Sequence, residues 1–99
     1  MFSYDVKNGV GGVVISFIGR LDTLGVSAHE SEIMDIVDNS NNVIFDLAEL
    51  EYCSSAGLRL FLQCQKKMNS RGVLTLINVS DAVYEIFEVT GFNDILHVQ

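Results

Sequence analysis

Proline and tryptophan are absent from this 99-residue chain, and cysteine occurs only twice. Without proline, helices and strands can run without interruption, and a proline-rich linker is excluded. Cys53 and Cys64 form no CxxC pair, and the chain lacks the richer cysteine and histidine patterns of zinc sites and disulfide frameworks. We therefore expect two reduced, buried thiols, no metal site and no cofactor.

Basic residues are also scarce, with 6 Lys and Arg against 13 Asp and Glu and a formal net charge of -7. Such a charge repels the phosphates of nucleic acids, so direct nucleic-acid binding is not expected. An acidic surface suits a basic protein partner, although acidic composition also serves solubility alone.

Long apolar runs and an export signal are missing as well. No apolar run approaches the length of a membrane span, and residues 1–5 lack a basic segment followed by an apolar one. Hydrophobic residues nevertheless make up 48% of the chain, enough for one core without metal or disulfide support. The sequence predicts one soluble, cytoplasmic domain.

Hydrophobic patterning predicts an alternation of strands and helices. Residues 4–6 and 13–18 are expected to be strands joined by a glycine-rich hairpin at 8–12, with Gly19 ending the second strand and 20–23 as a polar connection. A helix is expected from about Leu24, with an apolar stripe made of Val26, Ile33, Met34 and Val37.

Two continuous apolar runs follow, at 43–45 and 73–77, and we expect them to be neighbouring central parallel strands buried on both faces. Residues 46–53 are expected to be a loop. A second helix follows it, ended by Gly72 as the C-cap glycine, and a third runs from an N-cap at Ser80 to Gly91. Residues 95–98 are expected to form a final packed segment or edge strand. This order predicts an α/β fold with a mostly parallel, four- to five-stranded mixed sheet and helices mainly on one face.

The most informative segment runs from residue 46 to residue 58, where two serines open the second helix. A helix N-terminus offers unpaired backbone N–H groups and a partial positive charge. A serine hydroxyl there can cap the helix, and a phosphate added to it would meet the same donors. The local pattern alone leaves capping and phosphorylation both open.

Two motifs carry a family resemblance: Asp46-Leu47-Ala48 followed by Tyr52-Cys53-Ser54-Ser55-Ala56-Gly57-Leu58, and Gly19-Arg20-Leu21-Asp22. Together with the length and the order of elements, they resemble the STAS domain of bacterial anti-sigma factor antagonists. The resemblance implies a single STAS domain over residues 1–99.

The resemblance further implies a partner-switching phosphoprotein in transcription regulation. The unphosphorylated antagonist would bind an anti-sigma factor that is also a serine kinase, phosphorylation would release it, and a serine phosphatase would reset the switch. Alignment on Gly57 and Leu58 places the phosphoacceptor at Ser55. This chain has Ser54 where many members carry Asp and Ala56 where Ser is frequent, so Ser54 is the second choice for the acceptor and the expected N-cap.

The same resemblance implies a partner-binding surface around the acceptor. Its members are Asp22, Asp46, Glu49, Ser54, Ala56, Gly57 and Leu58. For Asp22 and Asp46, satisfying local N–H groups in turns is an equally open interpretation. We expect charge reversal at Asp22 or Glu49 to weaken partner binding while leaving thermal stability nearly unchanged.

An enzyme is not expected. Ser55, His29 and Asp46 could be written as a triad, but Ser55 lacks the Gly-x-Ser-x-Gly elbow and His29 is expected on the exposed side of a helix. Two alternatives remain: a STAS module in another partner-switching, secretion or lipid-transport complex, and a small serine-dependent enzyme.

Overall fold

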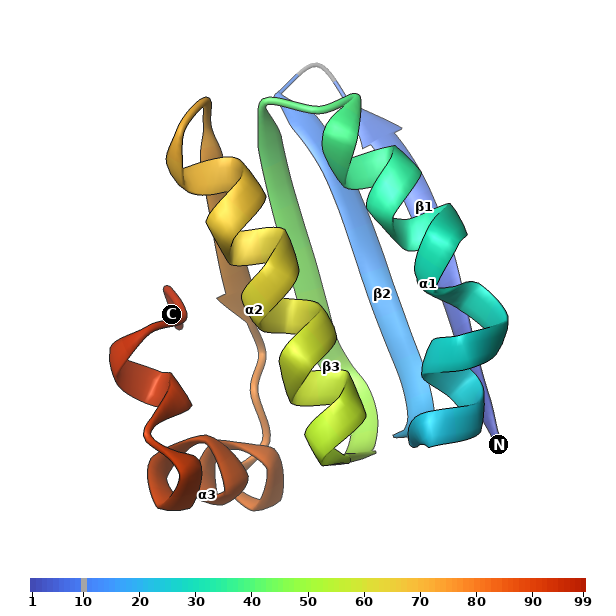
Figure 1. The fold of residues 1–99 in the computed structure, drawn as a ribbon, viewed down its shortest axis with the longest axis vertical. Coiled ribbons are helices and arrows are strands. Elements are labelled where there is room, and N and C mark those ends of the chain that lie inside the picture. The colour runs from blue at the N-terminus through green and yellow to red at the C-terminus, as the bar shows by residue number, and fades with distance from the viewer. Residues whose placement is uncertain (10) are drawn as a thin grey trace.

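The computed structural model describes residues 1–9 and 11–99, so Val10 of the predicted hairpin lies outside the described residues. The elements in chain order are β1 (Phe2–Gly9), β2 (Gly12–Leu21), α1 (Thr23–Asp38), β3 (Asn42–Cys53), α2 (Ser55–Asn69), β4 (Val73–Ile77), α3 (Asp81–Thr90) and the short turn η1 (Phe92–Asp94) (Figure 1). The strands form one sheet in the order β1-β2-β3-β4. The β1–β2 pair is antiparallel, whereas β2–β3 and β3–β4 are parallel. The predicted α/β fold with a mixed sheet is confirmed.

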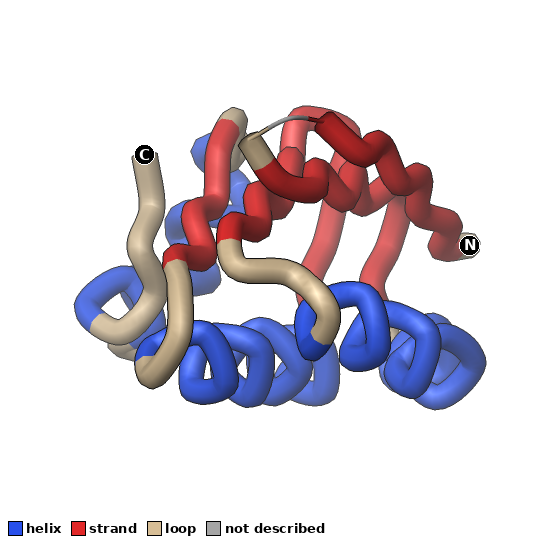
Figure 2. Tube along the Cα trace, turned by 90° about the horizontal axis from the view of Figure 1, so that it is seen from above, coloured by secondary structure: helices blue, strands red, loops and turns tan. Residues whose placement is uncertain are grey.

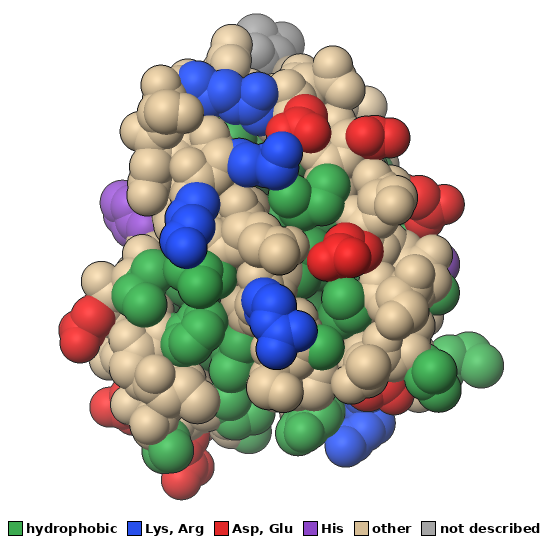
Figure 3. All heavy atoms as spheres, in the orientation of Figure 1, with side chains coloured by type: hydrophobic (Ala, Val, Ile, Leu, Met, Phe, Trp, Pro, Cys, Tyr) green, Lys and Arg blue, Asp and Glu red, His purple; other side chains and the backbone are tan. Residues whose placement is uncertain are grey.

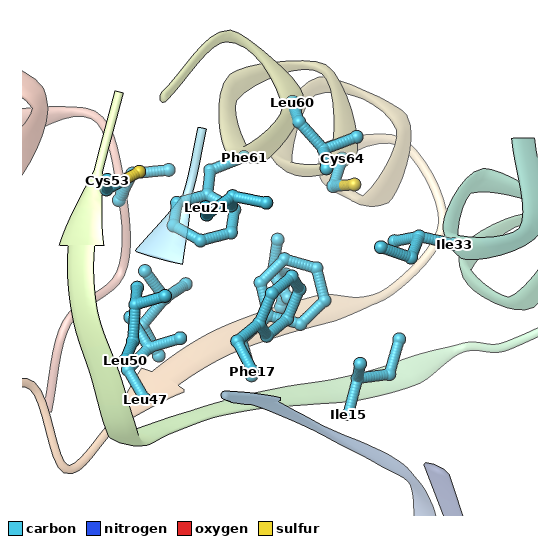
Figure 4. Packing of buried hydrophobic residues seen from close by; sticks show 14 of the residues in the cluster. Ile15, Phe17, Leu21, Ile33, Leu47, Leu50, Cys53, Leu60, Phe61 and Cys64 are labelled. Atoms are coloured by element: carbon cyan, nitrogen blue, oxygen red, sulfur yellow. The ribbon is translucent and has the colours of Figure 1, made fainter. Parts of the chain in front are cut away.

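Helices α1 and α2 lie side by side against one face of the sheet (Figure 2), and α3 lies across its end, below β4 and α2 in Figure 1. Burial in the strands therefore alternates, as it does at Val13, Ile15 and Phe17 of β2, whose side chains point toward the helices. Phe17 packs against Phe45 of β3 and Phe61 of α2, with ring centroids 4.8 and 5.3 Å apart. The core therefore lies between the sheet and the helices α1 and α2, with Ile33 of α1 pointing into it (Figure 4).

The expectation of a loop at residues 46–53 is wrong, because these residues continue strand β3. The apolar residues of this half, Leu47, Leu50 and Cys53, are buried but spaced by three, since the pairing with β2 shifts register there. The expectation rested on strict alternation, and a shift of register in the ladder breaks that pattern.

The positions of the last strands also differ from expectation. β3 and β4 are parallel neighbours as predicted, but β4 ends the sheet, and Val73 at its start is 50% exposed. Neither strand is buried on both faces, because the helices cover only one. The C-terminal segment meets β4 through a single bridge between Leu76 and Val98, so it forms no full edge strand.

The predicted ends of α3 are confirmed, whereas the predicted ends of β2 and α2 are wrong. Ser80 caps α3, and Gly91 ends it in a left-handed conformation with φ 79°, both as predicted. β2, in contrast, runs past Gly19 to Leu21, which is fully buried. Helix α2 ends at Asn69 with Ser70 as its C-cap, so Gly72 is no helix cap; a Cβ there would collide with the carbonyl of Asn41.

Candidate functional site

Two helix N-termini open side by side where β2 and β3 end. Leu21 and Cys53 are register partners at the carboxyl ends of these parallel strands, and the N–H of Ser54 donates to the carbonyl of Leu21 at 2.9 Å. The next residue of each chain segment is a helix N-cap. Asp22 Oδ1 accepts from the N–H of Gly25 at 2.8 Å and opens α1, and Ser54 opens α2 (Figure 1).

The two adjacent serines occupy different positions. Ser54 Oγ accepts from the N–H of Gly57 at 3.2 Å, which confirms the predicted N-cap. Ser55 is the first residue of α2 and is exposed, and nothing in residues 1–9 or 11–99 is hydrogen-bonded to its hydroxyl. The N–H groups of Ser55 and Ala56 precede the first helical hydrogen bond, from Leu58 N to the Ser54 carbonyl, and so remain available.

Gly57 allows α2 to begin this close to the sheet. A Cβ at this residue would lie 2.8 Å from Cys53 Sγ and 3.0 Å from Leu21 Cδ2. Gly57 is buried and Leu58 is only 4% exposed. The Leu58 side chain packs in the core and so offers a partner little surface, while Ala56 is half-buried at the surface.

Asp22 is a structural residue as well as a surface charge. Because its carboxylate caps α1, charge reversal would remove the cap, and the expectation of unchanged stability is corrected.

Asp46 lies elsewhere. Its Oδ1 accepts from Ala48 N–H and from Asn78 Nδ2, both at 3.1 Å, and so ties β3 to the residue after β4. Seven steps along β3 lead from Asp46 to Cys53, about 23 Å at the usual rise, so the structure does not bring Asp46 to Ser55.

The surface near the β2 and β3 ends carries acidic and basic side chains beside apolar ones (Figure 3). Glu49 and Glu51 line a shallow hollow of about 530 Å³, together with Ile18, Ala48, Leu50 and Ser80. Leu24, in the first turn of α1, is 79% exposed, and Tyr52 carries the Arg20 guanidinium 4.4 Å from its ring centroid. Sequence reasoning missed Leu24 and Tyr52. Leu24 could have been found because it lies off the apolar stripe of its helix.

His29 does not take part in this site. It lies in α1, half-buried against β1, with its ring centroid 5.3 Å from that of Tyr4 and Nδ1 3.0 Å from Glu32 Oε1. Tyr4 OH donates to the same carboxylate oxygen at 2.8 Å. Hydrogen bonds from His29 and then Tyr4 hold the pKa of Glu32 below its usual value. His29, expected on the exposed side of its helix, is therefore half-buried.

The two thiols are free and buried, as predicted. Burial raises the pKa of both Cys53 and Cys64 from 9.0 to about 12, so they are poor nucleophiles. Within residues 1–9 and 11–99, no three His, Cys, Asp or Glu side chains gather as metal ligands, and no helix there is long and apolar enough to cross a membrane.

Comparison with known proteins points to one family. The family model described as STAS domain matches residues 2–99. The anti-sigma-B factor antagonist of Staphylococcus aureus is 31% identical over 97 residues, covering 96% of this chain and 82% of that protein.

Solved structures show the same fold. An anti-sigma factor antagonist from Mycobacterium paratuberculosis superposes with a TM-score of 0.88 at 21% identity, covering 99% of this chain and 85% of the other. The phosphorylated form of SpoIIAA, a cell fate determinant of Bacillus, superposes with a TM-score of 0.75 at 20% identity, covering 98% and 91%.

Proposed function

This chain belongs to the STAS domain family, and we propose that it is a bacterial anti-sigma factor antagonist whose partner binding is switched by phosphorylation of Ser55. The name of its Staphylococcus relative supports the first part of the proposal. The existence of a phosphorylated form of SpoIIAA, which shares the fold, supports the second.

The main observation behind the proposal is that the two serine hydroxyls have different roles. Ser54 uses its hydroxyl to cap α2, whereas the Ser55 hydroxyl is exposed one residue later. A kinase can reach Ser55 without breaking the cap. The preferred acceptor is therefore Ser55, and phosphorylation would leave the fold intact.

A phosphate on Ser55 would act through charge. The free N–H groups of Ser55 and Ala56 and the helix dipole favour an anion at this point, so the modified state is stable. The phosphate adds close to two negative charges beside the capping carboxylate of Asp22. A partner surface shaped for the unmodified serine loses affinity through repulsion and the cost of desolvating the phosphate.

The unmodified state would bind an anti-sigma factor with serine-kinase activity, and a serine phosphatase would regenerate it in the cytoplasm. Exposed apolar side chains beside the charges, Leu24 and Tyr52, supply contact area that a charged surface lacks. The acidic Glu49 supplies charge for a basic partner. The protein acts by binding and does no chemistry: a serine nucleophile needs a base at its hydroxyl, and none bonds Ser55 within the described chain.

The proposal is tested by incubating the protein with its candidate GHKL-type kinase and ATP, followed by phosphopeptide mass spectrometry. We expect phosphate on Ser55, none on Ser55→Ala, and loss of kinase binding once the wild type is modified. Phosphate on Ser54 alone would move the acceptor by one residue. A chain that binds the kinase and takes no phosphate would overturn the switch.

A further inference from the structure

In the described chain, one edge strand of the sheet pairs with no further segment, and the other is covered at a single residue. At the β4 edge, Leu76 forms two hydrogen bonds with the C-terminal segment. Its N–H donates to the His97 carbonyl, and its carbonyl accepts from the Gln99 N–H, both at 2.9 Å. β1 forms the opposite edge, and no strand of the described chain lies beyond it (Figure 1). An eight-residue edge strand with free N–H and C=O groups is a template for a further strand.

The pairing of β1 with β2 fixes which backbone groups are free. The register runs without a shift from Phe2 opposite Gly19 to Gly9 opposite Gly12. The N–H of Arg20 donates to the carbonyl of Met1, so this pair is of the hydrogen-bonded type. Because the two types alternate along an antiparallel pair, the odd residues of β1 bond to β2. The even residues Phe2, Tyr4, Val6 and Asn8 direct their backbone groups outward.

Charge selects how a second β1 strand can pair with these groups. Asp5 and Lys7 are exposed and point to the sheet face without helices. With Val6 on a two-fold axis, Val6 pairs with Val6, Tyr4 with Asn8, and Asp5 of each copy lies opposite Lys7 of the other. Sliding by two residues places Asp5 opposite Asp5 or Lys7 opposite Lys7, which is unfavourable.

We propose that the β1 edge is a self-association surface, and that two copies of this chain pair antiparallel through β1 with Val6 on the two-fold axis. Tyr4 with Asn8 (twice) and Val6 with Val6 are hydrogen-bonded pairs, giving about six backbone bonds. The two Asp5–Lys7 pairs fix the register. The result is a continuous sheet across both copies, in which each interface residue meets its counterpart.

The helix side of this edge sets the strength of the dimer. Val6 and Ile36 line a hollow of about 320 Å³ beside β1, and the two hollows adjoin at the axis, where their apolar walls become covered. Asp35 lines the same hollow and is repelled by its counterpart. The interface is therefore of modest affinity. It leaves Ser55 free, because β2 separates β1 from β3 and α2.

Sedimentation equilibrium of the purified chain, from about 10 µM to about 1 mM, tests the association. Wild type should be a reversible dimer. Asp5→Lys and Lys7→Asp should each weaken dimerisation by about tenfold or more, since each converts two attractive pairs into repulsive ones. An equimolar mixture of the two variants should form a heterodimer, because one copy then carries two lysines and the other two acids.

The mixture of the two variants distinguishes lost charge pairing from misfolding. Circular dichroism establishes that each variant is folded, and restored association proves that neither was merely damaged. A wild type that stays monomeric near the highest concentration overturns the proposal, as does a dimer that neither charge reversal weakens. Association of the edge with an unrelated strand and not with itself also overturns it. The kinase is absent throughout, so the outcome is independent of the Ser55 switch.

Discussion

The N–H of Ser54 donates to the carbonyl of Leu21 at 2.9 Å, across the last rung between β3 and β2. This bond aligns the two strand ends. Asp22 follows the end of β2 and Ser54 follows the end of β3, so the two residues cap neighbouring helices. The phosphoacceptor candidate Ser55 is therefore set by sheet register as much as by its own helix. Substitutions near the starts of α1 and α2 can measure separately the effects of helix caps, packing and surface charge.

Ser54→Ala should lower the free energy of unfolding by about 1 kcal/mol, because the Gly57 N–H loses its capping oxygen. Denaturant unfolding measures the loss, and Ser54→Asp, which can still cap, should restore most of it. Phosphate incorporation at Ser55 should persist in both variants. A stability-neutral Ser54→Ala that abolishes phosphorylation would make Ser54 the acceptor.

Ser55→Asp should stay folded and gain a few tenths to about 1 kcal/mol, since a carboxylate is favoured at a helix N-terminus. It should bind the kinase more weakly than wild type, and Ser55→Ala should bind at least as well as wild type. Ser55→Asn is the matched control, with the size of Asp and no charge. Calorimetric titration of the three variants decides whether charge is the signal; equal affinities would refute it.

Substitutions of Asp22 can distinguish its cap from its charge. Asp22→Asn keeps a capping oxygen for the Gly25 N–H and should change the free energy of unfolding by a few tenths of a kcal/mol at most. Asp22→Ala loses the cap and should cost about 1 kcal/mol. If the carboxylate contacts a basic partner, both should weaken kinase binding about equally. If only Asp22→Ala, the less stable variant, bound the kinase more weakly, the Asp22 carboxylate would not be part of the interface.

Gly57→Ala should destabilise the protein by about 1 to 3 kcal/mol through overpacking, although alanine is the better helix former. The clash is mainly with Cys53 Sγ, 2.8 Å from the added Cβ. Adding Gly57→Ala to Cys53→Ala should therefore cost less than adding it to wild type. A double-mutant cycle from urea unfolding measures this coupling, and additive losses would place the strain elsewhere.

Alkaline pH should weaken the fold through its thiols. With pKa values raised to about 12 by burial, Cys53 and Cys64 stay protonated in the folded state, while the unfolded chain loses these protons above the ordinary value of 9.0. Stability from this source is complete below about pH 9 and falls as the pH rises toward 12, by up to about 1.4 kcal/mol per pH unit for each thiol. Urea unfolding at several alkaline pH values should give a shallower decline for Cys53→Ala. An unchanged decline would contradict the assignment.

Local signals in the sequence were sufficient for the starts of α2 and α3 and for the end of α3. Ser54 and Ser80 as N-caps, and Gly91 as a left-handed terminator, depend on interactions within four residues. The sequence also indicated the order of elements and, through two motifs, the family. These features are short-range, so the chain carries them wherever it is placed.

Tertiary structure decided what depends on residues far apart in the chain. Residues 46–53 became strand because β2 offers a partner for them, with a register shift that strict alternation does not anticipate. The same pairing brought Asp22 beside Ser54, and Asn78 drew Asp46 away from the site. Gly72 is required by the carbonyl of Asn41 and not by its own helix. Local propensity determines helices and caps, but register and close packing are set by neighbours that only the folded chain supplies.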